Sequence, residues 1–184
     1  PMYFLLGNLS CLEPCYTSNI LPRMLATFLT GDKTISVTGC FTQLYMFGLL
    51  TCTECYLLVS MSYDRYLAIC KPLHYSTRMN NRFCLQLAAG SWLNGCLITT
   101  IFVLFLSQST FCGLNEIDHF YCDVIPLMEL TCSEAHWIVL FHLIISCVFT
   151  LPPFLLTLTS YVCIIATILR IPSTTGRQKA FSTA

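Results

Sequence analysis

Charged residues are scarce in this chain of 184 residues, because Asp, Glu, Lys and Arg together make up 10% of it, against roughly 25% in an ordinary soluble domain. So few charges cannot cover a water-facing surface. The nine basic and nine acidic residues balance, so the net charge gives no reason to expect nucleic acid as a partner. The sequence also lacks a glycine-rich phosphate loop, a metal-binding histidine pattern and a nucleophile motif. We therefore expect no enzyme.

Long uncharged segments occupy much of the chain. No charged side chain lies between Arg82 and Glu116, or between Glu134 and Arg170. Each interval can hold the about 20 apolar residues that cross a bilayer as one helix.

Two more apolar stretches are each interrupted by a single acid. Glu54 interrupts residues 34–63, and Glu13 interrupts residues 2–21. The sequence therefore predicts an all-α membrane protein with about four complete membrane helices.

The ends of the chain are abrupt. It begins with Pro1 rather than Met and enters an apolar segment at once, without the basic leader of a signal peptide. Residues 179–184 stop without a helix terminator. We expect a piece of a longer protein.

The basic residues predict the topology. Seven of the nine cluster at span ends that share one side of the membrane, namely Arg65, Lys71, Arg78, Arg82, Arg170, Arg177 and Lys179. Basic residues accumulate on the cytoplasmic side. The loop at residues 107–134 is acidic and has no Lys or Arg, so we expect it to be extracellular.

Four cysteines fall on that outer side. Cys112, Cys122 and Cys132 lie in the acidic loop, and Cys40 lies at the outer start of a predicted helix. Disulfides persist outside the cell, and four cysteines allow three connectivities. Cys40 and Arg65 are 25 residues apart, or roughly 38 Å along a helix, so one helix can carry the cysteine outside and the arginine inside.

The most specific motif is MSYDRYLAICKPLHY, at residues 61–75. It resembles the signature of odorant receptors, a branch of the rhodopsin-like G-protein-coupled receptors. Asp64 beside Arg65 partly neutralises the guanidinium, and such a pair can hold the arginine in one state and release it in another. The resemblance assigns G-protein coupling to Asp64, Arg65, Tyr66, Lys71 and Pro72.

Further matches extend over nearly the whole chain: PMYFLLGNLS at 1–10, HFYCD at 119–123 and KAFST at 179–183. Ala184 departs from the family, where cysteine is usual. The resemblance implies one partial seven-helix receptor domain over 1–184. Its parts are helix two at about 1–28, helix three at 36–70, helix four at 83–106, extracellular loop two at 107–134, helix five at 136–170 and the start of helix six at 177–184.

The resemblance also implies two disulfides. One joins Cys40 to Cys122 and ties a helix to the extracellular loop, and the other joins Cys112 to Cys132 within that loop.

Two acids lie inside predicted spans. Glu54 precedes Arg65 by eleven residues, or roughly 16 Å along a helix, which is near mid-membrane. A carboxylate there is costly unless it is paired, protonated or turned to the bundle interior. The resemblance places Glu13 opposite Glu54. We hypothesise that the two acids and water hold a sodium ion, the only cofactor expected; the alternative is a neutral hydrogen-bonded pair that fixes helix packing.

Two helix faces are candidates for ligand binding, because their residues recur at steps of three and four. They are Phe47, Gly48, Thr51 and Cys52 on one helix, and His142, Ile145, Ser146 and Phe149 on another. If the faces meet, they form a mostly apolar pocket suited to small volatile organic molecules. Plain helix packing is the alternative for each residue.

The sequence is thus interpreted as part of an odorant-binding receptor, a multi-pass protein of the plasma membrane that activates a heterotrimeric G protein on binding a small volatile ligand. Two alternatives remain at this stage: a non-olfactory rhodopsin-like receptor for a peptide, amine or lipid, and a membrane transporter or channel.

Overall fold

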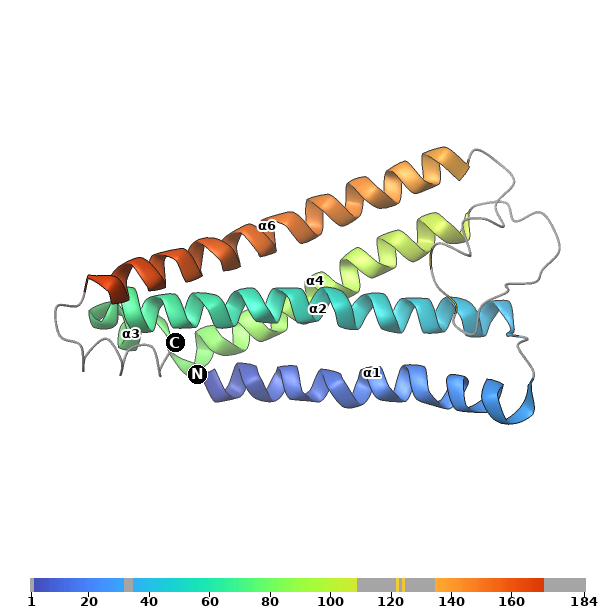
Figure 1. The fold of residues 1–184 in the computed structure, drawn as a ribbon, viewed down its shortest axis with the longest axis horizontal. Helices are drawn as coiled ribbons and strands as arrows, with labels where there is room; N and C mark the ends of the chain where they lie inside the picture. The colour runs from blue at the N-terminus through green and yellow to red at the C-terminus, as the bar shows by residue number, and fades with distance from the viewer. Residues whose placement is uncertain (1, 32–34, 109–121, 123, 125–134, 171–184) are drawn as a thin grey trace. The chain divides into compact units, whose positions relative to one another are not determined.

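The computed structural model describes residues 2–31, 35–108, 122, 124 and 135–170. Within these residues the chain forms helices and no strand, which confirms the all-α fold class (Figure 1). The helices are α1 (Met2–Thr30), α2 (Val37–Cys70), α3 (Pro72–Arg78), α4 (Asn81–Ser107) and α6 (Ala135–Leu169).

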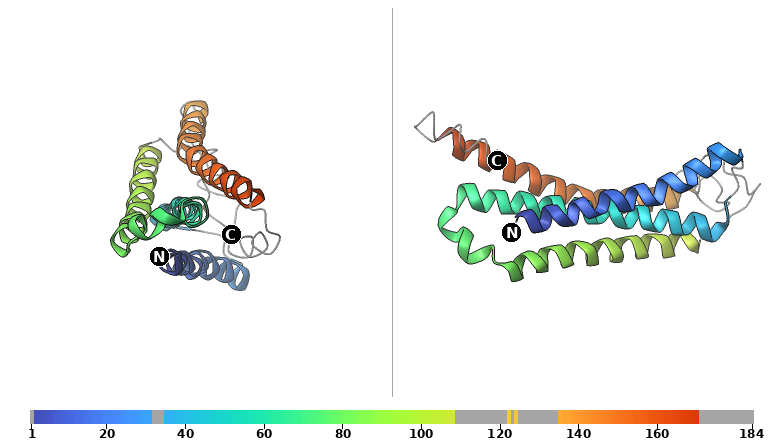
Figure 2. Two further views of the ribbon diagram at one scale, coloured as in Figure 1. Left: turned by 90° about the vertical axis from the view of Figure 1, so that its left-hand side faces the viewer. Right: turned by 90° about the horizontal axis from the view of Figure 1, so that it is seen from below.

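The bounds of the four long helices lie within two residues of those expected from the sequence. The expected start of another helix at 177–184 lies outside the described residues, as does nearly all of the loop at 107–134. The seven-residue helix α3 was not expected. Figure 2 shows that it connects the end of α2 to the start of α4.

Local sequence signals explain where the helices begin. The Ser36 hydroxyl accepts a hydrogen bond from the Gly39 amide at 3.1 Å, and the Asn80 side chain accepts one from the Phe83 amide at 2.8 Å. Both are N-caps, which satisfy amides that have no partner within the helix. Pro72 begins α3, at the position where its missing amide hydrogen costs nothing.

Gly31 explains where α1 ends. Its φ is 69°, in the left-handed region that glycine adopts without steric cost. Its amide donates to the Thr27 carbonyl at 3.0 Å, which satisfies one of the last carbonyls of the helix.

Three helices are long and apolar enough to cross a membrane by length and composition: α2, α4 and residues 139–169 of α6. With 29 residues α1 is long enough, but it is not among them. Its polar residues include Ser10, Glu13, Asn19 and Arg23, which lower its hydropathy. Membrane insertion of α1 therefore stays a prediction.

Hydroxyl side chains inside α2 are satisfied within the helix itself. Thr53, Ser60 and Ser62 are buried, and each donates to the carbonyl four residues earlier at 2.8–2.9 Å. A polar group in lipid is costly without a partner. These bonds allow α2 to carry hydroxyls through an apolar layer.

The chain divides into two compact units, and each of the four long helices α1, α2, α4 and α6 contributes to both. The first unit comprises the described residues within 1–9, 54–91 and 149–184. The second comprises those within 10–53 and 92–148.

The first unit has its core where α2, α3 and α4 meet. Leu67, Met79 and Cys84 are buried there, and the aromatic rings of Tyr66 and Tyr75 pack against them. The α6 segment of this unit contacts α2 through Cys70 Sγ and Thr167 Oγ1, which lie 3.2 Å apart. This core holds α3 against the end of α2.

The second unit is built on close helix packing. A Cβ added to Gly95 of α4 would meet the Thr53 hydroxyl and would lie 3.0 Å from the Leu49 carbonyl oxygen of α2. Small residues allow helix backbones to approach in this way in membranes. On the other side of α2, the amides of Asn19 and Gln43 each donate to the other's backbone carbonyl at 3.3–3.4 Å.

Candidate functional site

The Asp64-Arg65-Tyr66 triplet lies in the last two turns of α2. Asp64 is 1% exposed, whereas Arg65 and Tyr66 are half-buried. A carboxylate buried to this degree requires a hydrogen-bond donor, because an isolated charge in a low-dielectric interior is costly.

Tyr75 of α3 supplies that donor. Its hydroxyl donates to Asp64 Oδ1 at 3.1 Å. Burial raises the pKa of Tyr75 above its ordinary value, and the nearby negative charge of Asp64 raises the pKa further. The hydroxyl therefore keeps its proton near neutral pH and remains a donor.

Sequence reasoning missed this role of Tyr75. The residue stands at the end of the fifteen-residue motif, eleven positions after Asp64, but nothing in the sequence indicated that α3 would turn back onto α2. Lys71, followed by Pro72 at a helix start, was the available signal for a new helix.

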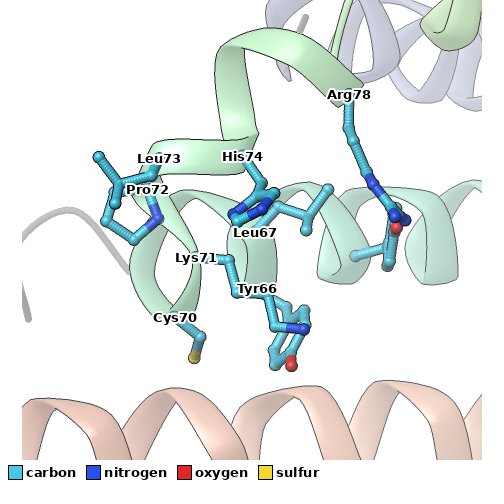
Figure 3. A pocket seen from close by; sticks show the side chains of 9 residues that line it. Tyr66, Leu67, Cys70, Lys71, Pro72, Leu73, His74 and Arg78 are labelled. Carbon is cyan, nitrogen blue, oxygen red and sulfur yellow. The ribbon is translucent and has the colours of Figure 1, made fainter.

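A cavity of about 550 Å³ opens beside this triplet, between α3 and the end of α2 (Figure 3). Its polar lining includes Tyr66, Lys71, His74 and Arg78, and its apolar lining includes Leu67, Pro72 and Leu73. In Figure 3 the Arg78 side chain extends from the end of α3 toward α2. The size is within the range of about 300–1,000 Å³ typical of small-molecule sites.

Three of the five residues predicted to couple to a G protein line this cavity: Tyr66, Lys71 and Pro72. The other two, Asp64 and Arg65, precede them on α2, and Asp64 is buried under α3 by its bond to Tyr75. Their role in coupling stays a prediction.

A disulfide joins Cys40 of α2 to Cys122, with the two Cα atoms 5.3 Å apart. This is one of the two pairings that the resemblance implied, and the Cα distance lies within the usual range for a disulfide. Both cysteines are buried with Leu44 and Leu106 in the core of the second unit. Cys112 and Cys132, the other predicted pair, lie outside the described residues.

The predicted ligand contacts on α2 have different surroundings. Phe47 packs edge-to-face on Tyr16 of α1, with ring centroids 5.8 Å apart. The Thr51 hydroxyl accepts a bond from the Tyr16 hydroxyl at 3.0 Å. Gly48 faces α4 instead, since a Cβ on it would lie 3.1 Å from Thr99 Cγ2, and this close approach explains the glycine without a ligand. Cys52 is half-buried.

The predicted contacts on α6 share one face. His142, Ile145, Ser146 and Phe149 are all half-buried, whereas Leu143, Ile144 and Val148 between them are more than half exposed. The His142 ring packs against the Phe102 ring of α4 at an interplanar angle of 55°, with centroids 5.0 Å apart. The predicted face is thus the inward one, but its ligand contact stays a prediction.

The two acids of the hypothetical sodium site lie on different helices. Glu13 is exposed on α1, and Glu54 is half-buried on α2. Among the described residues, no group of three or more His, Cys, Asp or Glu side chains could share a metal ion. The sodium site stays a hypothesis.

Comparison with known proteins shows the family. A family model described as olfactory receptor matches residues 1–184. Olfactory receptors 6P1 and 6B1 of Homo sapiens are 51% and 49% identical to the chain over 183 residues, and olfactory receptor 6B9 of Mus musculus is 46% identical. Each match covers 100% of this chain and 58% of the relative, so the chain spans little more than half the length of these relatives.

These matches decide between the alternatives that the sequence left open. They argue against a transporter, an enzyme and a receptor of another branch. The three membrane-crossing helices fit a multi-pass protein of the plasma membrane. The chain belongs to the olfactory receptor family.

Proposed function

We propose that this protein is an odorant receptor, in which a small volatile molecule bound toward the extracellular side favours a state that engages a heterotrimeric G protein on the cytoplasmic side. The observation that carries the proposal is the cavity next to Tyr66, Lys71 and Pro72 in a chain that matches the family over its whole length. The ligand acts only through its different affinities for the two states.

The contact between Tyr75 and Asp64 gives this switch a physical basis. Asp64 is bonded to α3, and Arg65 is its neighbour in the chain. A partner that moves α3 would therefore take the Tyr75 donor away from the negative charge beside Arg65. Rearrangement of such a charge pair is a common element of conformational switches.

Agonist-dependent nucleotide exchange on the G protein, measured in membranes at equal surface expression, tests the coupling role of Arg65. We expect Arg65→Gln to abolish exchange, because glutamine cannot keep the positive charge. Arg82→Gln is the matched control: it removes an exposed cation from the first turn of α4, outside the cavity lining. Full exchange in Arg65→Gln would contradict the proposal.

The proposed odorant pocket comprises Phe47, Thr51 and Cys52 on α2 and the half-buried face of α6 with His142, Ile145, Ser146 and Phe149. Gly48 contributes by bringing α4 close. The support is the mixed character of these residues, which are mostly apolar with one imidazole and two hydroxyls.

Odorant ranking tests the pocket. Phe47→Ala and Ser146→Ala should change the order of potencies within a panel of odorants. Their neighbours Met46 and Val148 are 38% and 57% exposed, so Met46→Ala and Val148→Ala serve as controls that should keep the order. An unchanged order in all four variants would reject this pocket.

We also propose the sodium site at Glu13 and Glu54, with Glu54 as the mid-membrane ligand. Replacing sodium with choline in the medium should shift the agonist response of the natural protein, and Glu54→Gln should remove that shift. If the sodium-dependent shift persists in Glu54→Gln, Glu54 does not bind sodium, and the alternative of a hydrogen-bonded acid that fixes helix packing remains.

A further inference from the structure

The cavity at the end of α2 carries a concentration of basic groups. Lys71, His74 and Arg78 all line it, and they come from α3 and the residue before it, a stretch of eight residues. All three are exposed. The acid of the same motif, Asp64, is 1% exposed and bonded to Tyr75, so its carboxylate is covered by protein and is not part of the cavity lining.

The position of the cavity along the chain indicates which anions it can meet. Helix α2 is long and apolar enough to cross a membrane and ends at Cys70, so Lys71 is the first residue after it, and the distribution of basic residues predicts that this end lies in the cytoplasm. Anionic lipids are concentrated in the cytoplasmic leaflet, and their headgroups lie at this level.

An apolar side chain stands next to the basic groups. Leu73 lines the cavity and is 88% exposed. In a water-facing loop such exposure of a leucine brings no advantage. At the membrane surface the side chain reaches the boundary between headgroups and acyl chains, where apolar residues of interfacial helices insert.

We propose that this cavity binds the phosphate groups of a phosphoinositide headgroup from the cytoplasmic leaflet. The planar guanidinium of Arg78 matches a phosphate with two parallel hydrogen bonds, and Lys71 provides a compact charge. His74 and Tyr66 add N–H and O–H donors. The cavity volume of about 550 Å³ suits one such headgroup. This inference requires only the membrane orientation of α2, so it does not depend on G-protein coupling.

Native mass spectrometry of the natural full-length protein with phosphatidylinositol bisphosphate, and with phosphatidylcholine as the neutral lipid, tests the proposal. We expect the phosphoinositide to bind preferentially. Each basic residue near the membrane surface contributes about fivefold in affinity, so Lys71→Gln together with Arg78→Gln should weaken binding about thirtyfold. Arg82→Gln is the matched control, since it removes a basic residue of the same side that does not line the cavity.

Four outcomes would overturn the proposal. In one, Arg82→Gln weakens binding as much as Arg78→Gln made alone, so that the attraction is only the general charge of this side. In another, soluble inositol trisphosphate binds as tightly as the lipid, so that free phosphate is the ligand. In the third, an acidic helical peptide occupies the cavity and the lipid does not. In the fourth, the double variant binds the lipid normally while thermal unfolding shows that it is folded.

Discussion

Removal of the Tyr75 hydroxyl is the smallest change that tests the proposed coupling site. Tyr75→Phe removes one oxygen and leaves the ring packed against Leu67, Met79 and Cys84. The lost bond is the 3.1 Å contact that holds α3 to the carboxylate of Asp64. We expect the variant to retain its helices and to loosen the docking of α3 on α2.

The size of this effect follows from the character of the acceptor. A hydrogen bond to a charged group stabilises a fold by about 1.5–3 kcal/mol, and about 1.4 kcal/mol corresponds to a factor of ten in an equilibrium constant. The amide hydrogens of α3 should therefore exchange about ten to a hundred times faster in Tyr75→Phe. The charge of Asp64 also loses its donor, which adds to the cost because Asp64 is buried.

Hydrogen exchange followed by mass spectrometry, on the protein in detergent or nanodiscs, measures this difference. Tyr63→Phe is the matched control: Tyr63 packs against the same cluster, and its ring contacts Phe83 at a centroid distance of 6.4 Å. This variant also removes one hydroxyl oxygen, but it leaves the bond from Tyr75 to Asp64 in place. Exchange of α3 at the rate of the natural protein in Tyr75→Phe would refute the reasoning. Equal acceleration in both variants would refute it as well.

Other contacts give predictions of similar precision. The pKa of Tyr75 is raised, so the stability that its hydrogen bond gives to α3 is complete below the ordinary pKa of about 10 and is lost only as pH rises through the raised value. The rate of amide hydrogen exchange in α3, corrected for the intrinsic rate, should therefore not change between pH 6 and 8. Gly95→Ala should lower the melting temperature, because overpacking costs about 1–3 kcal/mol and the new Cβ would lie 3.0 Å from backbone oxygen of α2. Gly90→Ala, whose Cβ would meet nothing within 4 Å, should raise the melting temperature. A lower melting temperature for Gly90→Ala than for Gly95→Ala would contradict the packing. Cys40→Ser should destabilise the protein by about 4.5 kcal/mol, since the disulfide closes a loop with a sequence separation of 82. Reduction of the natural protein should have the same effect in a thermal melt, and no change in either would exclude a structural role.

Much of the fold can be predicted because it depends on the hydropathy and charge of consecutive residues. Uncharged runs predicted spans where α4 and α6 lie, since a helix of that length is the main way to bury backbone amides in lipid. For α2 the stretch at residues 34–63 covers only part of a helix that extends to Cys70, and the bounds 36–70 came from the family resemblance. The same approach predicted a span over α1, which is not among the helices apolar enough to cross a membrane by composition, so its insertion stays a prediction. Hydropathy alone cannot say whether neighbouring helices satisfy such polar groups.

The candidate site was predicted in part. The triplet at Asp64 was evident from its motif, and Tyr66, Lys71 and Pro72 line one cavity because they lie at the end of α2 and the start of α3. Their role in coupling stays a prediction. The packing of the glycines was not predicted: Gly48, a candidate for ligand contact with plain helix packing as the alternative, lies against Thr99 of α4. A glycine in an apolar helix looks the same in sequence whether it faces a pocket or a neighbouring helix.

The sequence by itself determined that the chain is a helical membrane protein and which family it belongs to, and it predicts which end of each helix faces the cytoplasm, because hydropathy, motif and charge are all properties of consecutive residues. Only the tertiary structure decided that Tyr75 donates a hydrogen bond to Asp64, that Gly95 allows α4 to pack closely against Thr53 of α2, and that a basic cavity opens between α3 and α2. Those features depend on distances between side chains of different helices, and such distances are set by how the helices pack.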